Sequence, residues 1–138
     1  MDKQEGEISL FQTAGFSMWP FLNPCQKIIV KRLPAADLKL GELVLYKTND
    51  QLVCHRFIKR IKKSSGYFIY TQADASCLSR PEAIMEERLC GKVIGIVKGD
   101  RIVNMERIRQ RYINILIIIF APILCAGFNV YRLLRRKK

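Results

Sequence analysis

Residues 51–72 read QLVCHRFIKRIKKSSGYFIYTQ, and this stretch carries the clearest signal of fold class. Two runs rich in β-branched and aromatic residues, 51–61 and 66–72, flank the polar joint KSSG at 63–66. A short joint that contains glycine, between two runs of this composition, is typical of a β-hairpin. The stretch therefore predicts two neighbouring antiparallel strands.

The same composition continues on both sides of this hairpin. Comparable runs separated by Pro, Gly or Asn-Asp punctuation lie at 27–33, 42–47 and 89–97. The joint TND at 48–50 again favours an antiparallel pair, and no stretch of helical period and comparable strength appears before residue 103. We expect an all-β domain, in which the least regular part, 77–88 (CLSRPEAIMEER), forms a loop or a short helix.

The C-terminal part of the chain differs sharply in composition. Residues 112–131 read YINILIIIFAPILCAGFNVY and contain no charge. As a helix this segment would extend about 30 Å, the thickness of the hydrocarbon core of a bilayer. A buried terminal helix of a soluble protein is the alternative, but a small domain rarely covers a helix that is apolar on every side. We therefore divide the chain into a domain at 1–106 and a transmembrane anchor at 107–138.

The formal net charge of +12 invites a nucleic-acid interpretation, which its distribution disfavours. Residues 107–138 hold 8 of the 24 basic residues and no acidic ones, so residues 1–106 carry 16 basic against 12 acidic residues, a net charge of +4. The excess flanks the apolar segment, where cations interact with anionic headgroups. We expect the lipid membrane, not a nucleic acid, to be the partner of this charge.

The sequence gives no clear membrane orientation. Five basic residues lie just before the apolar segment and five just after it, so the positive-inside rule returns a tie. The N-terminus MDKQEGEISLFQ has neither the basic start nor the apolar run of a secretory signal. Taken plainly, this predicts a single-pass tail anchor with the domain in the cytoplasm. Outward placement would require the terminal helix itself to drive translocation of the domain.

The cysteines point to no disulfide framework. Five cysteines form an odd set without a C-x-x-C spacing, and the chain has one histidine. This pattern indicates reduced thiols and neither a zinc site nor another metal or cofactor site.

Three residues could carry nucleophilic chemistry. Ser17 lies between Gly15 and Pro20, which suits a serine held on a bend, and His55 is the sole imidazole. By strand alternation, His55 should lie on the more apolar face of its strand, where its pKa can be tuned. Asp74 follows a predicted strand, from whose end a carboxylate could reach back to the imidazole. A serine needs such a base to attack a peptide, and the base usually needs an orienting group.

The order of short motifs resembles the signal peptidase I family over about residues 14–97. GFSMWPFL at 15–22 resembles the family's G-x-S-M-x-P-x-L box, and LGELVLY at 40–46 its G-D-I-V strand. VCHRFI at 53–58 is similar to the V-x-H-R-V-V box of the branch that has histidine as base, which includes endoplasmic-reticulum, archaeal and sporulation enzymes. TQADAS at 71–76 and GKVIG at 91–95 resemble the two boxes that follow.

The resemblance implies a signal-peptidase/LexA-like all-β catalytic domain and a membrane-bound serine endopeptidase. In it Ser17 is the nucleophile, His55 the general base and Asp74 the orienting acid, and the substrate is an exported precursor cleaved after a small residue. Two departures stand out. The stretch that often holds a second aspartate ends here in Glu82, a less favoured acid, and Gly15 lacks the hydroxyl that helps many relatives bind the oxyanion, so backbone amides near Ser17 would do so.

Other interpretations remain open at this point. The missing second aspartate also fits a catalytically inactive membrane adaptor that binds precursors or anionic lipid. A lysine such as Lys59 or Lys62 could replace His55 as base, as in LexA-type peptidases. Cys54 is adjacent to His55, but neighbouring strand residues face opposite ways, so packing is the better account of this thiol.

Overall fold

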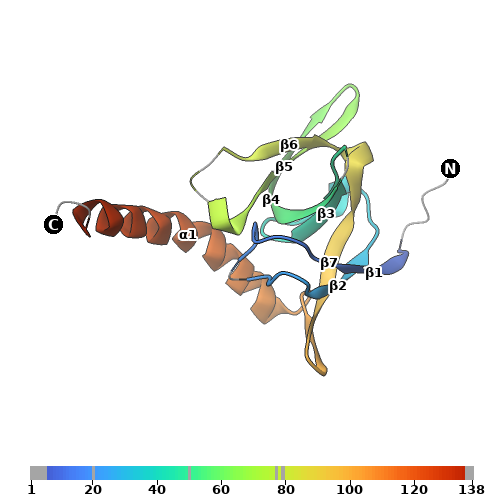
Figure 1. Ribbon diagram of the computed structural model, residues 1–138. Helices are drawn as coiled ribbons and strands as arrows, with labels where there is room; N and C mark the ends of the chain where they lie inside the picture. The colour runs from blue at the N-terminus through green and yellow to red at the C-terminus, as the bar shows by residue number, and fades with distance from the viewer. Residues whose placement is uncertain (1–5, 20, 50, 77, 79, 136–138) are drawn as a thin grey trace.

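The chain folds around one antiparallel sheet, followed by a long helix (Figure 1). This computed structural model describes residues 6–135 apart from residues 20, 50, 77 and 79. The strands are β1 (Ile8–Gln12), β2 (Lys27–Lys31), β3 (Leu43–Lys47), β4 (Leu52–Lys63), β5 (Gly66–Gln72), β6 (Glu82–Met85), β7 (Leu89–Lys98) and β8 (Arg101–Asn104). Their order is β1-β2-β7-β3-β4-β5-β6, and β8 pairs with β7. The helix α1 spans Ile108–Arg135.

The mainly β architecture predicted from the sequence is confirmed, including both hairpins. Strands β3 and β4 pair antiparallel across the 48–50 joint, and β4 and β5 pair antiparallel across the 63–66 joint. The register places Val44 opposite His55 and Arg56 opposite Gln72. Long-range pairing of β7 with both β2 and β3 then joins the two halves of the sheet.

Strand β3 lies at the centre of the core and is buried on both faces. Leu43 and Leu45 belong to one apolar cluster with residues of β2 and β7, whereas Val44 and Tyr46 belong to a second cluster with residues of β4 and β5. Successive residues of a strand point to opposite faces, so the two clusters cover the two sides of β3. This explains why LVLY reads as a continuous apolar run instead of an alternating one.

The structure corrects the expectation for residues 77–88 and adds three short strands. Residues 82–85 form β6, where we expected a loop or a short helix, whereas the short 3₁₀ helix Glu86–Arg88 that follows agrees with that expectation. Strands β1 and β8 were also not predicted. The residues Cys77 and Ser79 of the same stretch lie outside the described residues.

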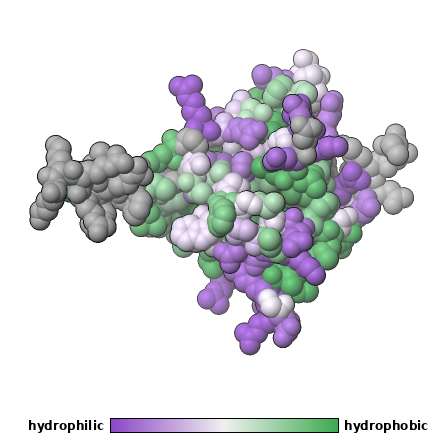
Figure 2. All heavy atoms as spheres, viewed as in Figure 1, coloured by the Kyte–Doolittle hydropathy of each residue, from purple (hydrophilic) through white to green (hydrophobic). Residues whose placement is uncertain are grey.

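The helix α1 is long and apolar enough to cross a membrane. The stretch 109–127 meets this test by length and composition, and 6% of it is buried inside the protein. Figure 1 shows the second half of α1 extending away from the sheet, and hydrophobic atoms gather where the helix leaves the domain (Figure 2). This low burial fits the predicted anchor better than the alternative of a buried terminal helix.

The first half of α1 contacts the domain. Asn114 is 2% exposed and lies against Gly41, and its Oδ1 has no hydrogen-bond partner among the described residues. Further along the helix, a small cavity of about 30 Å³ lies between α1 and the domain. It is lined by residues of β4, by the turn after β5, and by Ile117, Ile118, Ala121 and Pro122 of α1. Helix α1 is thus attached to the domain through packing as well as through the chain.

Candidate active site

Ser17 is presented by a closed loop between β1 and β2. Thr13 ties the base of this loop, because its N–H donates to Gln26 O at 2.8 Å, its carbonyl accepts from Cys25 N at 2.8 Å and its hydroxyl donates to Asn23 O at 2.9 Å. Within the loop, Gly15 has φ +79°, a conformation that favours glycine, as its position before Ser17 predicted. The loop therefore has a defined shape that leaves Ser17 exposed.

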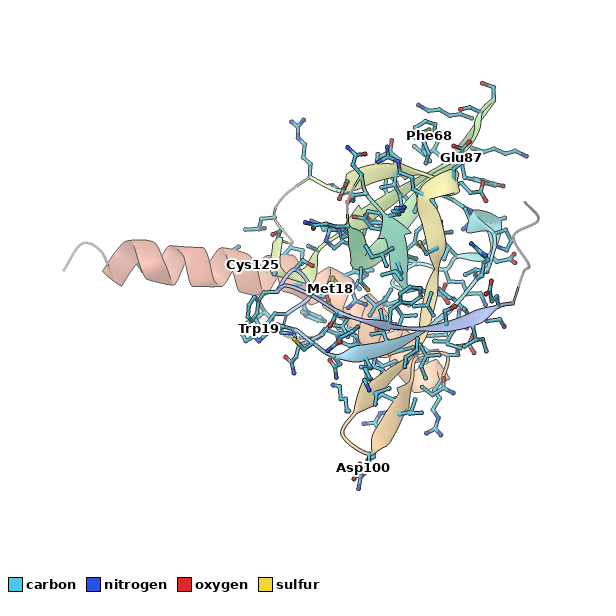
Figure 3. All side chains as sticks on the ribbon, turned by 45° about the vertical axis from the view of Figure 1, so that its right-hand side comes forward. Met18, Trp19, Phe68, Glu87, Asp100 and Cys125 are labelled. Atoms are coloured by element: carbon cyan, nitrogen blue, oxygen red, sulfur yellow. The ribbon has the colours of Figure 1, made fainter. Side chains whose placement is uncertain are left out.

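The residues next to Ser17 fix the loop on the sheet. Met18 is 3% exposed and Leu22 2%, and both belong to the apolar cluster under β2 and β7. Trp19 is 56% exposed and Phe16 69%. Figure 3 shows Met18 directed toward the sheet and Trp19 at the outside of the molecule. Two buried anchors thus hold the turn, while two aromatic side chains face outward beside the hydroxyl.

His55 lies on β4 and faces the same cavity as Ser17. This cavity of about 790 Å³ is lined by the loop 11–18, by Val53, Cys54 and His55 of β4, and by Glu82 of β6. The His55 side chain is 14% exposed, and Val53 and Phe57 belong to the cluster that contains its neighbour Tyr46, as alternation along the strand predicts. The fold therefore brings the predicted nucleophile and the predicted base to one cavity.

Tyr46 and Glu82 complete the surroundings of the imidazole. Tyr46 Oη lies 2.8 Å from His55 Nδ1 and donates a hydrogen bond to Glu82 Oε2 at 2.8 Å. The tyrosine and histidine rings meet edge to face, with centroids 5.7 Å apart. Tyr46 is fully buried, whereas the Glu82 side chain is half-exposed. The carboxylate on the His55 side of the site is thus Glu82, reached through a tyrosine.

Burial is the main influence on the protonation of His55. It lowers the pKa of the imidazole below its ordinary value of 6.5, and the negative charges of Glu82 and then Asp74 act in the opposite direction. At neutral pH the imidazole is therefore neutral and able to accept a proton. Burial also raises the pKa of Tyr46, so its hydroxyl stays protonated.

Asp74 does not have the place that the sequence predicted for it. Its two carboxylate oxygens accept hydrogen bonds from Arg56 Nε at 2.8 Å and Arg56 Nη2 at 2.6 Å, with both side chains nearly buried. The Arg56 guanidinium also donates to Gly41 O and stacks over Phe21, 5.0 Å from the ring centroid. Arg56 and His55 are successive residues of β4 and point to opposite faces of the strand. The carboxylate of Asp74 therefore lies with Arg56 on the face opposite to His55. In place of the expected hydrogen bond from His55 to Asp74, the structure shows an ion pair between Arg56 and Asp74.

The turn that contains Asp74 nevertheless contacts the nucleophile loop. Residues Asp74–Ser76 form a 3₁₀ turn, whose Ala75 N–H donates to Ser17 O at 3.0 Å. The ion pair of Arg56 and Asp74 thus holds this 3₁₀ turn in place, and the hydrogen bond from Ala75 N–H holds the backbone of Ser17. Asp74 is therefore linked to the backbone of Ser17 through this turn, and it influences His55 only through its charge.

The hydroxyl of Ser17 is not hydrogen-bonded to His55 among the described residues. Catalytic hydrogen bonds are often long without substrate and tighten when it binds. Within the same described set, the amides of Ser17 and Met18 donate no hydrogen bond, although the next amide, Trp19 N, donates to Phe16 O. These two backbone donors beside the nucleophile are thus unpaired within the described residues.

The alternative bases lie outside the cavity, whereas the alternative nucleophile Cys54 lines it from the strand face opposite to His55. Lys59 lies over the ring of Tyr70 and Lys62 over that of Tyr67, and neither lines the cavity of Ser17. Cys54 packs against the apolar cluster that contains Met18 and Leu22, whereas Tyr46, the neighbour of His55, belongs to the other cluster. Burial raises the pKa of the Cys54 thiol to about 12. Packing is therefore confirmed as the account of Cys54.

The cysteines depart in one place from the expectation of reduced thiols. Cys25, Cys54 and Cys90 form no disulfide, but Cys125 of α1 is disulfide-bonded (labelled in Figure 3). In the part of the chain that the structure describes, no group of three or more His, Cys, Asp or Glu side chains could hold a metal ion.

The sequence does not single out Tyr46, and it favours Asp74 over Glu82 as the acid, but Tyr46 and Glu82 are the residues that lie beside the imidazole. In the sequence, Tyr46 is only the last residue of a strand motif, and Glu82 belongs to the stretch of least regular pattern. The sequence does contain a signal for the contact between Tyr46 and His55. The two residues lie on either side of the short joint at 48–50, which places them on neighbouring strands. The register pairs Tyr46 with Val53, so His55 is the diagonal neighbour on the same face. No family model, curated protein or solved structure matches this chain in comparisons with known proteins.

Proposed function

We propose that this chain is a membrane-bound serine endopeptidase of the signal peptidase I type, with Ser17 as nucleophile and His55 as general base. The observation that carries the proposal is the cavity shared by an exposed serine on a fixed loop and the chain's sole imidazole. Ser17 lies on the loop between β1 and β2, and His55 lies on β4, far away in the sequence. The signal-peptidase/LexA-like identity of the all-β domain belongs to the same proposal.

The chemistry needs only groups that line the cavity. Neutral His55 accepts the proton of the Ser17 hydroxyl as Oγ attacks the carbonyl carbon of the peptide bond. The tetrahedral intermediate collapses, its C–N bond breaks, and His55 gives the proton to the leaving amine. Water then attacks the resulting ester, again with His55 as base, which releases the acid and restores the serine hydroxyl.

Backbone amides stabilise the oxyanion in this proposal. Gly15 offers no hydroxyl, and the amides of Ser17 and Met18 are the donors beside the nucleophile. Such donors act most strongly where water is excluded, and the buried Met18 and Leu22 side chains hold this backbone in place.

The surroundings of the site favour an extended peptide that arrives at a membrane surface. Apolar side chains of Met18, Leu22, Ile28 and Leu45 line the cavity, which suits small apolar residues of a precursor. The exposed Phe16 and Trp19 flank Ser17, and aromatic side chains of this kind prefer the membrane–water interface. The apolar helix α1 supplies the membrane attachment that such a substrate requires.

Mass spectrometry of co-expressed precursor proteins tests the proposal. A chain with wild-type sequence should generate a new precursor N-terminus after a small residue, and Ser17→Ala should abolish it. Ser64→Ala is the matched control, because Ser64 lies in the turn between β4 and β5 and not in the cavity. Identical precursor termini in wild type and Ser17→Ala would reject the peptidase.

The competing function is an inactive membrane adaptor that binds precursors or anionic lipid. The missing hydrogen bond between Ser17 and His55 is the observation that favours it. An adaptor retains precursors in a co-purification whether or not Ser17 is present and generates no new N-terminus, so the same experiment separates the two functions.

A further inference from the structure

The oxygen of Tyr46 is the meeting point of three side chains. His55 Nδ1 and Glu82 Oε2 each lie 2.8 Å from it, and the hydroxyl of Thr71 donates to it over a longer 3.5 Å. Tyr46 and Thr71 are fully buried, so neither exchanges these partners for water. The arrangement fixes where protons can lie.

Counting protons at this oxygen assigns the tautomer of the histidine. A tyrosine hydroxyl has one proton, and the carboxylate of Glu82 can only accept. The Tyr46 proton therefore points to Glu82, and the short contact to His55 Nδ1 is a hydrogen bond only if Nδ1–H is the donor. A neutral imidazole protonated at Nδ1 has an unprotonated Nε2.

We propose that Glu82, acting through Tyr46, holds His55 in its Nδ1–H tautomer and so leaves Nε2 free to accept the proton of Ser17. Tyr46 and Glu82 are thus positioning residues, and the importance of the tautomer for catalysis rests on the proposed function. The tautomer itself does not.

Glu82 cannot do this directly. Its Oε2 lies 3.9 Å from His55 Nδ1, beyond hydrogen-bond distance, so the tyrosine fills the gap between the two. Pairing of β5 with β6 sets that separation, since the register places Glu82 opposite the buried Thr71. The strand that was not expected from the sequence therefore delivers the carboxylate.

The same arm stabilises the imidazolium that forms during the reaction. When His55 takes the proton of Ser17, its positive charge lies next to a hydrogen-bonded chain that ends in the negative Glu82. Charge-assisted hydrogen bonds are about twice as strong as neutral ones, so the chain Nδ1–H, Tyr46, Glu82 strengthens at that moment.

Nitrogen NMR of the sole histidine tests the tautomer without a substrate. The full chain, with ¹⁵N-labelled histidine in detergent micelles at about pH 8, gives signals from one imidazole whose neutral form dominates. We expect Nδ1 to be the protonated nitrogen. Tyr46→Phe should shift the population toward Nε2–H, and Glu82→Gln should shift it in the same direction, because an amide can also donate to the tyrosine.

Glu7→Gln is the matched control. The Glu7 side chain is 55% exposed and that of Glu82 51%, but Glu7 pairs with Arg32 and does not line the cavity. The nitrogen spectrum of His55 in Glu7→Gln should be the same as in the wild type. A wild-type Nε2–H tautomer, or an unchanged spectrum in both Tyr46→Phe and Glu82→Gln, would overturn the inference.

Kinetics then separate this inference from the proposed function. On a cleaved precursor peptide, we expect Glu82→Gln to lower kcat by about 10²-fold, within the usual range for general-base catalysis, with little change in KM. A wild-type chain without cleavage but with the Nδ1–H tautomer would reject the peptidase and keep the tautomer assignment. Cleavage with an unchanged kcat in Glu82→Gln would reject the positioning role.

Discussion

At the scale of single residues, His55 is held neutral by burial, and the stability of the fold should record this. The pKa of the folded imidazole is below its ordinary 6.5, so between these two values the unfolded chain binds a proton that the folded chain does not. The stabilising contribution is therefore fully present above about pH 6.5 and falls as the pH is lowered toward the folded pKa.

This predicts a pH-dependent difference between wild type and His55→Gln. The free energy of unfolding of the wild type should fall by up to about 1.4 kcal/mol per pH unit below about pH 6.5 relative to the variant. Urea titrations of both chains at a series of pH values measure it. Parallel curves for the two chains would contradict a depressed pKa.

The ion pair of Arg56 and Asp74 gives a second prediction at this scale. Asp74→Asn leaves a buried guanidinium without its charge partner, and breaking a buried pair costs about 3–5 kcal/mol. We expect a lower unfolding midpoint and a looser Ser17 loop, but the same histidine tautomer as in the wild type, because Asp74 contacts Arg56 and not His55. A changed tautomer would restore Asp74 as the orienting acid.

Part of the site could be predicted from the sequence because two of its residues carry their own signals. His55 is the sole imidazole, and Ser17 sits between Gly15 and Pro20. The acid could not be assigned in the same way, since carboxylates are common and their partners depend on strand pairing. Pairing of β6 with β5 places Glu82 beside Tyr46 and His55, whereas Asp74 pairs with Arg56.

At the scale of elements, the strands that the sequence predicted are those with buried residues on at least one face. The strands it missed lack this pattern. In β1 the exposed residues include Ile8 and Leu10, and in β6 one residue of four, Ile84, is buried. Such short edge strands form because a neighbour offers unpaired backbone groups, which a single-strand pattern does not reveal.

The junction of α1 with the domain supplies a prediction for an element. Gly41 has φ +87°, and a Cβ there would lie 3.2 Å from Asn114 Cβ. Gly41→Ala should therefore lower stability both by about 1–2 kcal/mol of backbone strain and by displacing α1. Thermal unfolding of the full chain in detergent measures the sum.

Gly6→Ala separates the two effects. Gly6 has a similar φ of +89° with nothing within 4 Å of the added carbon, so this variant has the backbone strain without the contact to α1. We expect a larger loss of stability for Gly41→Ala. Equal losses would show that the packing of Asn114 contributes nothing.

At the scale of the whole molecule, the proposal joins a β domain to a membrane through one helix. Ile119 is 54% exposed near the middle of the apolar stretch, and an arginine at the centre of a spanning helix costs about 2.5–3.5 kcal/mol of insertion. Ile119→Arg should therefore reduce retention of the chain in carbonate-washed membranes. Ile102→Arg, at a 63% exposed position of β8, is the matched control and should leave retention unchanged. Equal retention of both variants would contradict a membrane-spanning α1.

The orientation of the domain can be read from an exposed thiol. Cys54 suits this poorly, because the raised pKa of its buried thiol slows its reaction, and Cys77 lies outside the described residues. Cys25 is free and exposed, on the loop that carries Ser17. An impermeant maleimide applied to intact cells should leave Cys25 unlabelled if the domain is cytoplasmic, whereas labelling from outside would place the site on the outer face.

The central claim is that Ser17 and His55 can share one proton, and the alkylation of a Ser17→Cys variant tests it most directly. A thiol beside an imidazole has a depressed pKa, so at about pH 6.5 this thiol should react with iodoacetamide about tenfold faster than the exposed Cys25 of the same chain, as quantified by peptide mass mapping. Adding His55→Ala should abolish that advantage. An unchanged rate without the imidazole would contradict the pair, and with it the peptidase.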